Sequence, residues 1–126
     1  MPNGSFDPAL LKRLRSAEEV EIETCAAPGA PVHRTIIWIV VDEQDRVLIR
    51  SYRGPGARWY REATLWPACA LHVSGESVSV TVVPALDAER IGACSRGYLA
   101  KYARHRATPQ MLDETNLPTT LELLPR

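Results

Sequence analysis

The sequence predicts a mainly β domain with two or three short helices, in which the strands form a small barrel or a curled antiparallel sheet. Short runs of β-branched or alternating apolar residues recur along the chain, which is the pattern of strands. The connections between these runs are too short for the crossovers of a parallel sheet. At 126 residues the chain can bury one core but not two, so we treat 1–126 as a single domain. Within it, 1–31 would supply a helix, an edge strand and a loop, and 32–126 the core of the barrel.

The first part of the chain carries signals for a helix and then a strand. Asp7-Pro8 has the residue types of an N-cap and a first helical position, and a leucine stripe follows over 10–14. Val20, Ile22 and Thr24 alternate with glutamates, as in a strand with one solvated face. The proline and glycine residues of 27–31 then predict a loop.

The middle of the chain predicts a hairpin followed by a short helix. Thr35–Val41 is almost wholly apolar and β-branched, so we expect a central strand covered on both faces. Arg46–Ser51 would be its hairpin partner. After the arginine-rich residues, Glu62–Trp66 would complete a short helix that Pro67 ends, because the residue before a proline avoids the helical conformation.

The last part of the chain predicts a second hairpin, a longer helix and a closing strand. Ala68–Ser74 and Ser77–Val83 would be joined by Gly75-Glu76 as the centre of a type II′ turn. Asp87 is placed to cap a helix, and Thr119–Leu124 has the pattern of a strand. Residues at helical spacing follow that cap: Ile91, Cys94 or Ser95, Tyr98 and Tyr102.

The composition argues against several classes of function. The 15 basic and 15 acidic residues balance, so no excess charge favours nucleic-acid binding. Met1–Asp7 has no secretory signal pattern and no apolar run approaches the roughly 20 residues that span a bilayer, so we expect a cytoplasmic protein. Cys25, Cys69 and Cys94 form no CxxC pair, and we interpret them as reduced apolar fillers. The widely spaced histidines predict no metal site.

One segment concentrates positive charge. Arg46–Arg61 contains five arginines and no carboxylate, and Gly54-Pro55-Gly56 interrupts it. Guanidinium groups, backbone donors and aromatic rings could meet there around an anionic, partly aromatic ligand. The alternative is that Arg58 and Arg61 are solvated, or pair with Glu62 and the acidic strand around Glu21.

Aromatic residues offer the wall of a binding site. Trp59 and Tyr60 are flanked by arginines and are the better candidates for stacking on a planar ring. Trp38 and Trp66 fit a core or an interface better. His72, between Leu71 and Val73, is either a structural histidine or a candidate catalytic acid or base facing a barrel cavity.

The order of motifs from about residue 32 to 124 resembles the FMN-binding split-barrel superfamily, which includes pyridoxamine-phosphate oxidases and deazaflavin-dependent reductases, and is most similar to an uncharacterised bacterial branch. The resemblance implies a split β-barrel of about six antiparallel strands. It also implies a homodimer with a cofactor groove between the subunits. The matching segments are His33–Trp38, Val47–Ser51, Arg53-Gly54, Arg58–Arg61 and Pro67.

The sequence differs from the oxidases of that superfamily in the motif that binds the flavin phosphate. There, a Ser-Arg-Lys triplet grips the flavin phosphate shortly before an Asn-Pro pair. The corresponding residues here are Ala57, Arg58, Trp59 and Trp66-Pro67, so only the arginine and the proline match. The sequence therefore leaves open whether FMN, a deazaflavin or no cofactor binds. The candidate cofactor-binding residues are Arg50, Ser51, Arg53, Arg58, Trp59, Tyr60 and Arg61.

Three functions remain open at the level of sequence. The first is a flavin- or deazaflavin-binding oxidoreductase acting on a small metabolite, in which the cofactor carries the redox chemistry. The second is a cofactor-free barrel that binds an apolar or aromatic metabolite as a carrier, cyclase or isomerase. The third is an interaction module without small-molecule chemistry.

Overall fold

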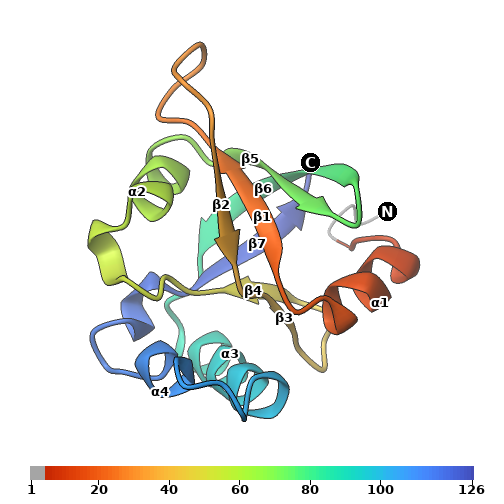
Figure 1. Cartoon of the computed structure of the whole chain (residues 1–126), viewed down its shortest axis with the longest axis vertical. Helices are drawn as coiled ribbons and strands as arrows, with labels where there is room; N and C mark the ends of the chain where they lie inside the picture. The colour runs from red at the N-terminus through yellow and green to blue at the C-terminus, as the bar shows by residue number, and fades with distance from the viewer. Residues whose placement is uncertain (1–4) are drawn as a thin grey trace.

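A computed structural model describes residues 5–126, which form a curled antiparallel sheet with helices around it (Figure 1). The strands of this part of the chain are β1 (Val20–Thr24), β2 (His33–Ile37), β3 (Val40–Val41), β4 (Val47–Ile49), β5 (Ala68–Val73), β6 (Glu76–Pro84) and β7 (Leu121–Pro125). The helices are α1 (Pro8–Ser16), α2 (Arg58–Leu65), α3 (Ala88–Lys101) and α4 (Thr108–Met111), with short 3₁₀ turns η1 (Gly54–Gly56) and η2 (Leu117–Thr119).

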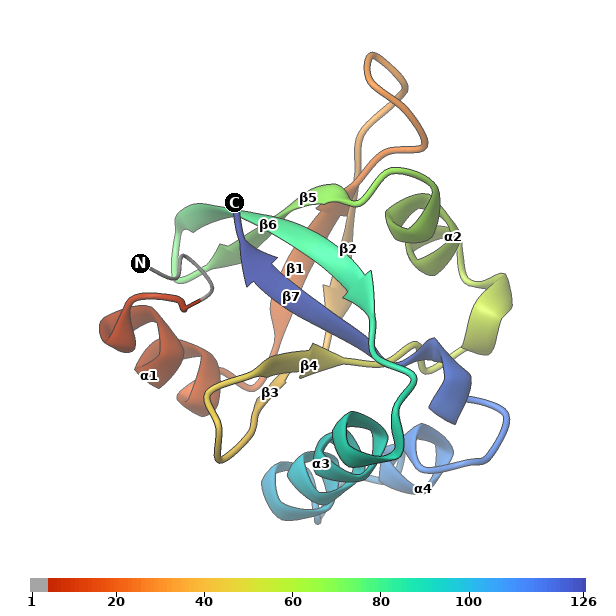
Figure 2. The same cartoon turned by 180° about the vertical axis from the view of Figure 1, so that it is seen from behind.

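The sheet closes on itself through the chain rather than through hydrogen bonds. Its order is β2-β1-β5-β6-β7-β4-β3, so β2 and β3 form its two edges. Only Trp38 and Ile39 separate these two strands in the sequence. The sheet therefore curls until its edges are neighbours, as both views show (Figures 1 and 2). This is the half-open barrel that the sequence predicted, built of seven strands in the described residues instead of about six.

The predicted central strand Thr35–Val41 is wrong in two respects. It is divided between β2, which pairs with β1, and β3, which pairs with β4, so the expected hairpin exists only between β3 and β4. It is also not covered on both faces, since Ile36 is 60% exposed. A continuous apolar run predicts one buried strand, but here the run is divided into two strands that form the two opposite edges of the sheet.

Side chains at the C-terminal end of α3 replace strand pairing at the division between β2 and β3. The Nζ of Lys101 donates to the carbonyl of Ile39 at 2.7 Å and to that of Leu14 at 2.9 Å. The hydroxyl of Tyr102 accepts a hydrogen bond from the Ile39 N–H at 3.3 Å. Trp38 stacks on the ring of Tyr102, with centroids 4.1 Å apart. Burial lowers the pKa of Lys101 to about 8.

The predicted edge strand near the N-terminus is in fact an interior strand. β1 lies between β2 and β5, with Glu21 opposite His72 and Ile36 on its two sides. Its alternation was interpreted correctly, because Ile22 is fully buried and the glutamates face outward. The alternation of polar and apolar residues shows which face of a strand is solvated. The number of neighbouring strands depends instead on pairing with residues far away in the sequence.

The helix signals were largely correct. The side chain of Asp7 caps α1 by accepting from the Ala9 N–H at 3.0 Å, and Asp87 caps α3 by accepting from the Arg90 N–H at 3.0 Å. α2 ends before Pro67, as expected, and it begins at Arg58. The first helical turn therefore lies within the arginine-rich segment.

The turn between β5 and β6 differs from the predicted type II′ geometry. Val73 pairs with Glu76, so Ser74 and Gly75 are the central residues, with φ values of 51° and 80°. Two positive φ values define a type I′ turn, whose twist matches that of a two-stranded hairpin. The glycine occupies the second central position and not the first.

The apolar side chains pack in two clusters. One fills the barrel and includes Leu14, Ile22 and Leu71, and the other packs β3 and β4 against α3. Gly97 of α3 faces Val40, and a Cβ built at Gly97 would lie only 2.9 Å from the Val40 Cβ. This close approach fixes α3 against the strand that leads to the arginine-rich segment.

The cysteines of the described residues are free thiols. Cys69 and Cys94 are buried, and burial raises the pKa of Cys69 to about 11 and that of Cys94 to about 12. These two fit the prediction of apolar fillers, while Cys25 is only half-buried. None of the helices in residues 5–126 combines the length and apolarity needed to cross a bilayer.

Candidate functional site

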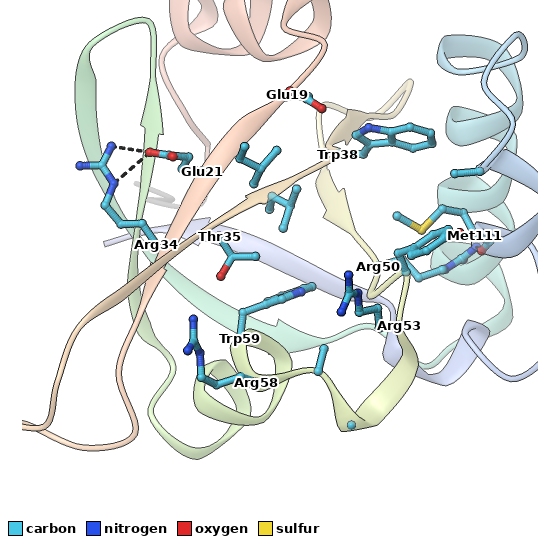
Figure 3. A pocket seen from close by; sticks show the side chains of 16 residues that line it. Glu19, Glu21, Arg34, Thr35, Trp38, Arg50, Arg53, Arg58, Trp59 and Met111 are labelled. Atoms are coloured by element: carbon cyan, nitrogen blue, oxygen red, sulfur yellow. Dashed lines mark hydrogen bonds and ion pairs between the residues drawn. The ribbon is translucent and has the colours of Figure 1, made fainter.

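A cavity of about 930 Å³ lies where the strand-to-helix segment after β4 faces β2 and the end of α4 (Figure 3). Its floor and walls come from segments that are distant in the sequence. Four guanidinium groups and two indole rings are among the groups that line it, and Figure 3 draws them around the same space. The lining residues that matter most below are Arg50, Arg53, Arg58, Trp38, Trp59 and Tyr52.

Arg50 is a buried cation in the cavity wall. It follows β4 directly, and only 1% of it is exposed. Its guanidinium donates to the Thr120 and Ser95 hydroxyls at 2.9 and 3.0 Å and to the Met111 and Ile91 carbonyls at 3.0 and 3.1 Å. All four acceptors are neutral. The hydrogen bonds are therefore satisfied while the charge has no counterion among residues 5–126.

Arg53 is presented to the cavity by a tightly fixed bend. Gly54 has a φ of 80°, which glycine adopts without strain, and a Cβ there would lie 3.2 Å from the Asn116 Oδ1. The Ser51 hydroxyl donates to the Gly54 carbonyl at 2.7 Å, and the Asn116 amide donates to the Tyr52 carbonyl at 3.1 Å. These bonds set the direction in which the exposed Arg53 side chain leaves the backbone.

Arg58 and Trp59 occupy the first turn of α2. The N-cap residue Ala57 has no side chain that could accept from the helix N–H groups, and the first turn contains no acidic residue. The first-turn N–H groups have no intrahelical acceptor, so the positive end of the helix dipole remains uncompensated at the cavity. Trp59 is 7% exposed and packs mainly into the barrel core, so it offers the cavity only part of its ring.

The other predicted cofactor residues do not line this cavity. Ser51 is fully buried and holds the bend described above. Tyr60 is half-buried and packs edge-on against Trp59 with ring centroids 6.1 Å apart. Arg61 is exposed, and its Nε donates to the Gly56 carbonyl at 3.2 Å. The structure thus brings together Arg50, Arg53, Arg58 and Trp59, and places the other three beside or beneath them.

The candidate catalytic residue His72 lies apart from the arginines. Its Nε2 is 2.8 Å from the Glu23 Oε1, an outward-facing carboxylate on β1. It lines a second cavity of about 430 Å³, which shares Glu19, Glu21, Arg34 and Ile36 with the first. A catalytic role for His72 stays a prediction that requires a ligand reaching across both cavities.

Several residues at the cavity carried little signal in the sequence. Trp38 lines it as well as stacking on Tyr102, so it belongs to the second core cluster and to the cavity together. Arg34 also lines it, but its guanidinium is neutralised by Glu21 at 2.6 Å. Trp66, expected in a core or an interface, is 37% exposed, so the core interpretation is wrong.

The arginines of the cavity differ from others in their partners. Arg46 pairs with Asp42 at 2.7 Å, and Arg90 pairs with Glu122 at 2.9 Å. Hydrogen bonding to Asp42 raises the pKa of Arg46. Within residues 5–126, Arg58 and Arg61 form no ion pair, so the alternative that they pair with Glu62 or Glu21 is wrong, while both side chains are exposed to solvent. Glu62 pairs instead with His33.

Comparison with known proteins places the chain in a family. A family model described as uncharacterised protein conserved in bacteria, DUF2255, matches residues 10–123. The chain belongs to this family. The matched residues of the DUF2255 family include the whole cavity lining described above. No curated protein sequence matches the chain.

Solved structures show the same fold at low sequence identity. HutZ, the heme storage protein from Vibrio cholerae, is 11% identical with a TM-score of 0.65, over 97% of this chain and 91% of that one. An F420-H2 dependent reductase is 12% identical with a TM-score of 0.61, over 84% and 93%. The conserved hypothetical protein Rv2991 from Mycobacterium tuberculosis is 11% identical with a TM-score of 0.67, over 98% and 81%. This DUF2255 protein therefore has the split-barrel fold that its motifs predicted.

Proposed function

We propose that this protein binds an anionic, planar cofactor, FMN or a deazaflavin, in the arginine-lined cavity and acts as an oxidoreductase on a small metabolite. The observation that carries the proposal is the convergence of Arg50, Arg53 and Arg58 on one cavity without carboxylate partners in residues 5–126. Unpaired guanidinium groups beside an uncapped helix N-terminus favour a phosphate or carboxylate.

Each group has a distinct part in holding such a cofactor. Arg53 and Arg58 are exposed and free to donate directly to phosphate oxygens. Arg50 has most of its donors engaged, so it contributes mainly the field of a buried charge. Trp38 and the exposed part of Trp59 provide aromatic surface for the ring. The bound ring would supply the redox chemistry, and the chain would orient it and exclude water.

The fold alone does not choose the cofactor, because one structural neighbour is a heme storage protein and another an F420-H2 dependent reductase. The cavity lining favours a flavin-type group over heme. His33, His72 and His105 all lie outside the lining, and so do the cysteines of residues 5–126. Heme commonly takes an axial histidine or cysteine ligand.

We further propose that the functional form is a cytoplasmic homodimer in which a second copy covers the open side of the cavity. β2 is an edge strand beside the cavity, and Ile36 on it is 60% exposed. One structural neighbour is described as a domain-swapped dimer. Free thiols such as Cys69 suit the reducing cytoplasm.

Cofactor titration of matched variants tests the proposal. Purified protein is titrated with FMN and with deazaflavin, and the quenching of cofactor and tryptophan fluorescence is recorded. We expect Arg58→Ala to weaken binding about tenfold or more. Arg61→Ala, in the same helix but outside the cavity, should leave it within about twofold. Failure of the unsubstituted protein to bind either cofactor would contradict the proposal.

A second candidate function rests on the residues at positions 57 and 59. Ala57 and Trp59 stand where the oxidase pattern has phosphate-gripping serine and lysine, and both line the cavity. These apolar groups favour a cofactor-free barrel that binds an aromatic metabolite. In that case Arg58→Ala should leave the affinity for an uncharged aromatic ligand unchanged, while neither FMN nor deazaflavin binds.

A further inference from the structure

The buried arginine at the end of β4 retains one hydrogen-bond donor for a ligand. Four of the five N–H groups of Arg50 donate to neutral acceptors, and the fifth, on Nη2, has no acceptor among residues 5–126. Only 1% of this residue is exposed, yet it lines the cavity of about 930 Å³. Burying a charge without a counterion costs free energy, so this guanidinium attracts an anion to its part of the cavity.

The surroundings of Arg50 in the cavity are aromatic and apolar. Its Nη1 donates to the carbonyl of Met111 at 3.0 Å, and Met111 lines the cavity as well. Its Cζ lies 5.9 Å from the centroid of the Tyr98 ring, and that ring lies 6.4 Å from the ring of Trp38, another lining residue. We call Arg50, Trp38 and Met111 the Arg50 subsite. One fixed positive charge between apolar walls suits an organic acid with an aromatic or apolar body.

The Arg50 subsite is separate from the end of the cavity formed by α2. Arg58 stands in the first turn of α2, and Figure 3 draws it on the opposite side of the cavity from Trp38 and Met111. Arg53 lies between the two ends. The cavity volume is near the upper limit of small-molecule pockets, roughly 300 to 1,000 Å³, so two groups can occupy it together. An anion at the α2 end would therefore leave the charge of the Arg50 subsite without a partner.

We propose that the Arg50 subsite binds the carboxylate of the substrate, an aromatic or apolar monocarboxylic acid that lies beside the cofactor. That this acid is the substrate rests on the proposed function, whereas its binding rests on the subsite alone. A carboxylate fits better than a phosphate, because one free N–H and one positive charge match a monoanion. A phosphate brings about two negative charges and three acceptor oxygens. A neutral ligand would leave the buried charge unpaired.

The test compares two ligands of equal shape, naphthalene-2-carboxylate and naphthalene-2-carboxamide. Their dissociation constants are measured by calorimetry at about pH 7.5, first without cofactor and then with saturating FMN or deazaflavin. We expect the unsubstituted protein to bind the carboxylate at least about tenfold more tightly than the amide, because a hydrogen bond between charged groups is about twice as strong as a neutral one. Equal affinity for the two ligands, or binding of neither, would overturn the proposal.

Substitutions at both ends of β4 locate the preference for the carboxylate. Arg50→Met should bring the ratio of the two affinities close to one, and Arg50→Lys, which keeps the charge but not the planar fork, should lower it to about threefold. The control Arg46→Lys should keep the full ratio, since Arg46 pairs with Asp42 and lies outside the cavity lining. If Arg50→Met does not fold, the ratio in Arg50→Lys decides.

The ratio distinguishes binding of the ligand from support of the fold. A purely structural role for Arg50 would weaken the carboxylate and the amide alike, and an unchanged ratio in Arg50→Lys would overturn the proposal. Loss of the preference in Arg58→Ala but not in Arg50→Lys would also overturn it, because the carboxylate would then lie at the α2 end.

The measurements with cofactor separate this proposal from the one on which it depends. The carboxylate should bind within about threefold of the same affinity whether or not FMN or deazaflavin is bound, and competition between acid and cofactor would contradict two separate subsites. If neither cofactor binds but the carboxylate binds through Arg50, the cofactor proposal fails and the acid subsite stands. If a cofactor binds but the carboxylate is not preferred over the amide, only the substrate class fails.

Discussion

The two arginines that flank β4 have opposite surroundings. Arg46, before the strand, pairs with Asp42, whose side chain also accepts hydrogen bonds from the Gln44 and Arg46 N–H groups at 2.9 Å. Arg50, after the strand, is more deeply buried and has only neutral acceptors. The comparison teaches that position beside a strand does not distinguish a structural arginine from one that lines a cavity. The presence or absence of a carboxylate partner distinguishes them.

The largest effect should follow from removing Arg50. Arg50→Met leaves the Met111 and Ile91 carbonyls and two hydroxyls without their donor, and we expect a loss of roughly 3 kcal/mol in the free energy of unfolding. Urea denaturation measures it. A loss below that of Asp42→Asn would break the comparison, because it would make the unpaired guanidinium structurally dispensable.

A smaller loss in the free energy of unfolding should follow from removing the carboxylate that pairs with Arg46, before β4. Asp42→Asn keeps an oxygen that can accept from the backbone but removes the charge opposite Arg46, so we expect about 1 kcal/mol. The affinity for FMN or deazaflavin should not change, since Asp42 is absent from the cavity lining. Weakened cofactor binding in this variant would show that the two sides of β4 are not independent.

A pH-confined effect should come from Glu62. Burial alone would raise its pKa, but hydrogen bonds from Thr24 and His33 lower it in the folded protein, so it contributes stability that is present above its unfolded value, near 4.3, and is lost as pH falls through the folded value. The free energy of unfolding of the unsubstituted protein, measured by urea denaturation, should therefore fall more steeply below about pH 4.5 than that of Glu62→Gln. Parallel profiles for the two proteins would contradict this assignment.

The smallest effect should follow from removing an exposed cavity arginine. Arg53 makes no ion pair with the described residues, so Arg53→Ala should change the free energy of unfolding by less than about 0.5 kcal/mol. This would sharpen the comparison, because it assigns Arg53 to the ligand and not to the fold. A loss above about 1 kcal/mol by thermal denaturation would assign it a structural role instead.

Local signals in the sequence predicted much of the fold. Asp7 and Asp87 cap helices as expected because a capping bond involves only neighbouring residues. The division of Thr35–Val41 could not be predicted, since it depends on Lys101 and Tyr102 reaching Ile39 from α3. The interior position of β1 likewise depends on pairing with residues about 50 positions away.

The candidate site was predicted as a segment but not as a set of contacts. The bend at Gly54 and the concentration of arginines indicated where an anion could bind. Nothing local showed that Arg50 would turn inward to neutral acceptors, that Arg61 would lie outside, or that Glu62 would take His33 as its partner. These outcomes depend on backbone carbonyls of α3 and η1 and on a side chain of β2.

The most direct test compares cofactor binding by the double variant Arg53→Ala/Arg58→Ala with binding by Arg46→Met. Both changes remove positive charge from the same region of sequence, but only the first removes it from the cavity. Fluorescence titration with FMN and deazaflavin should show binding lost in the double variant and retained in Arg46→Met. Equal binding by the two variants would contradict the claim that unpaired arginines form an anion site.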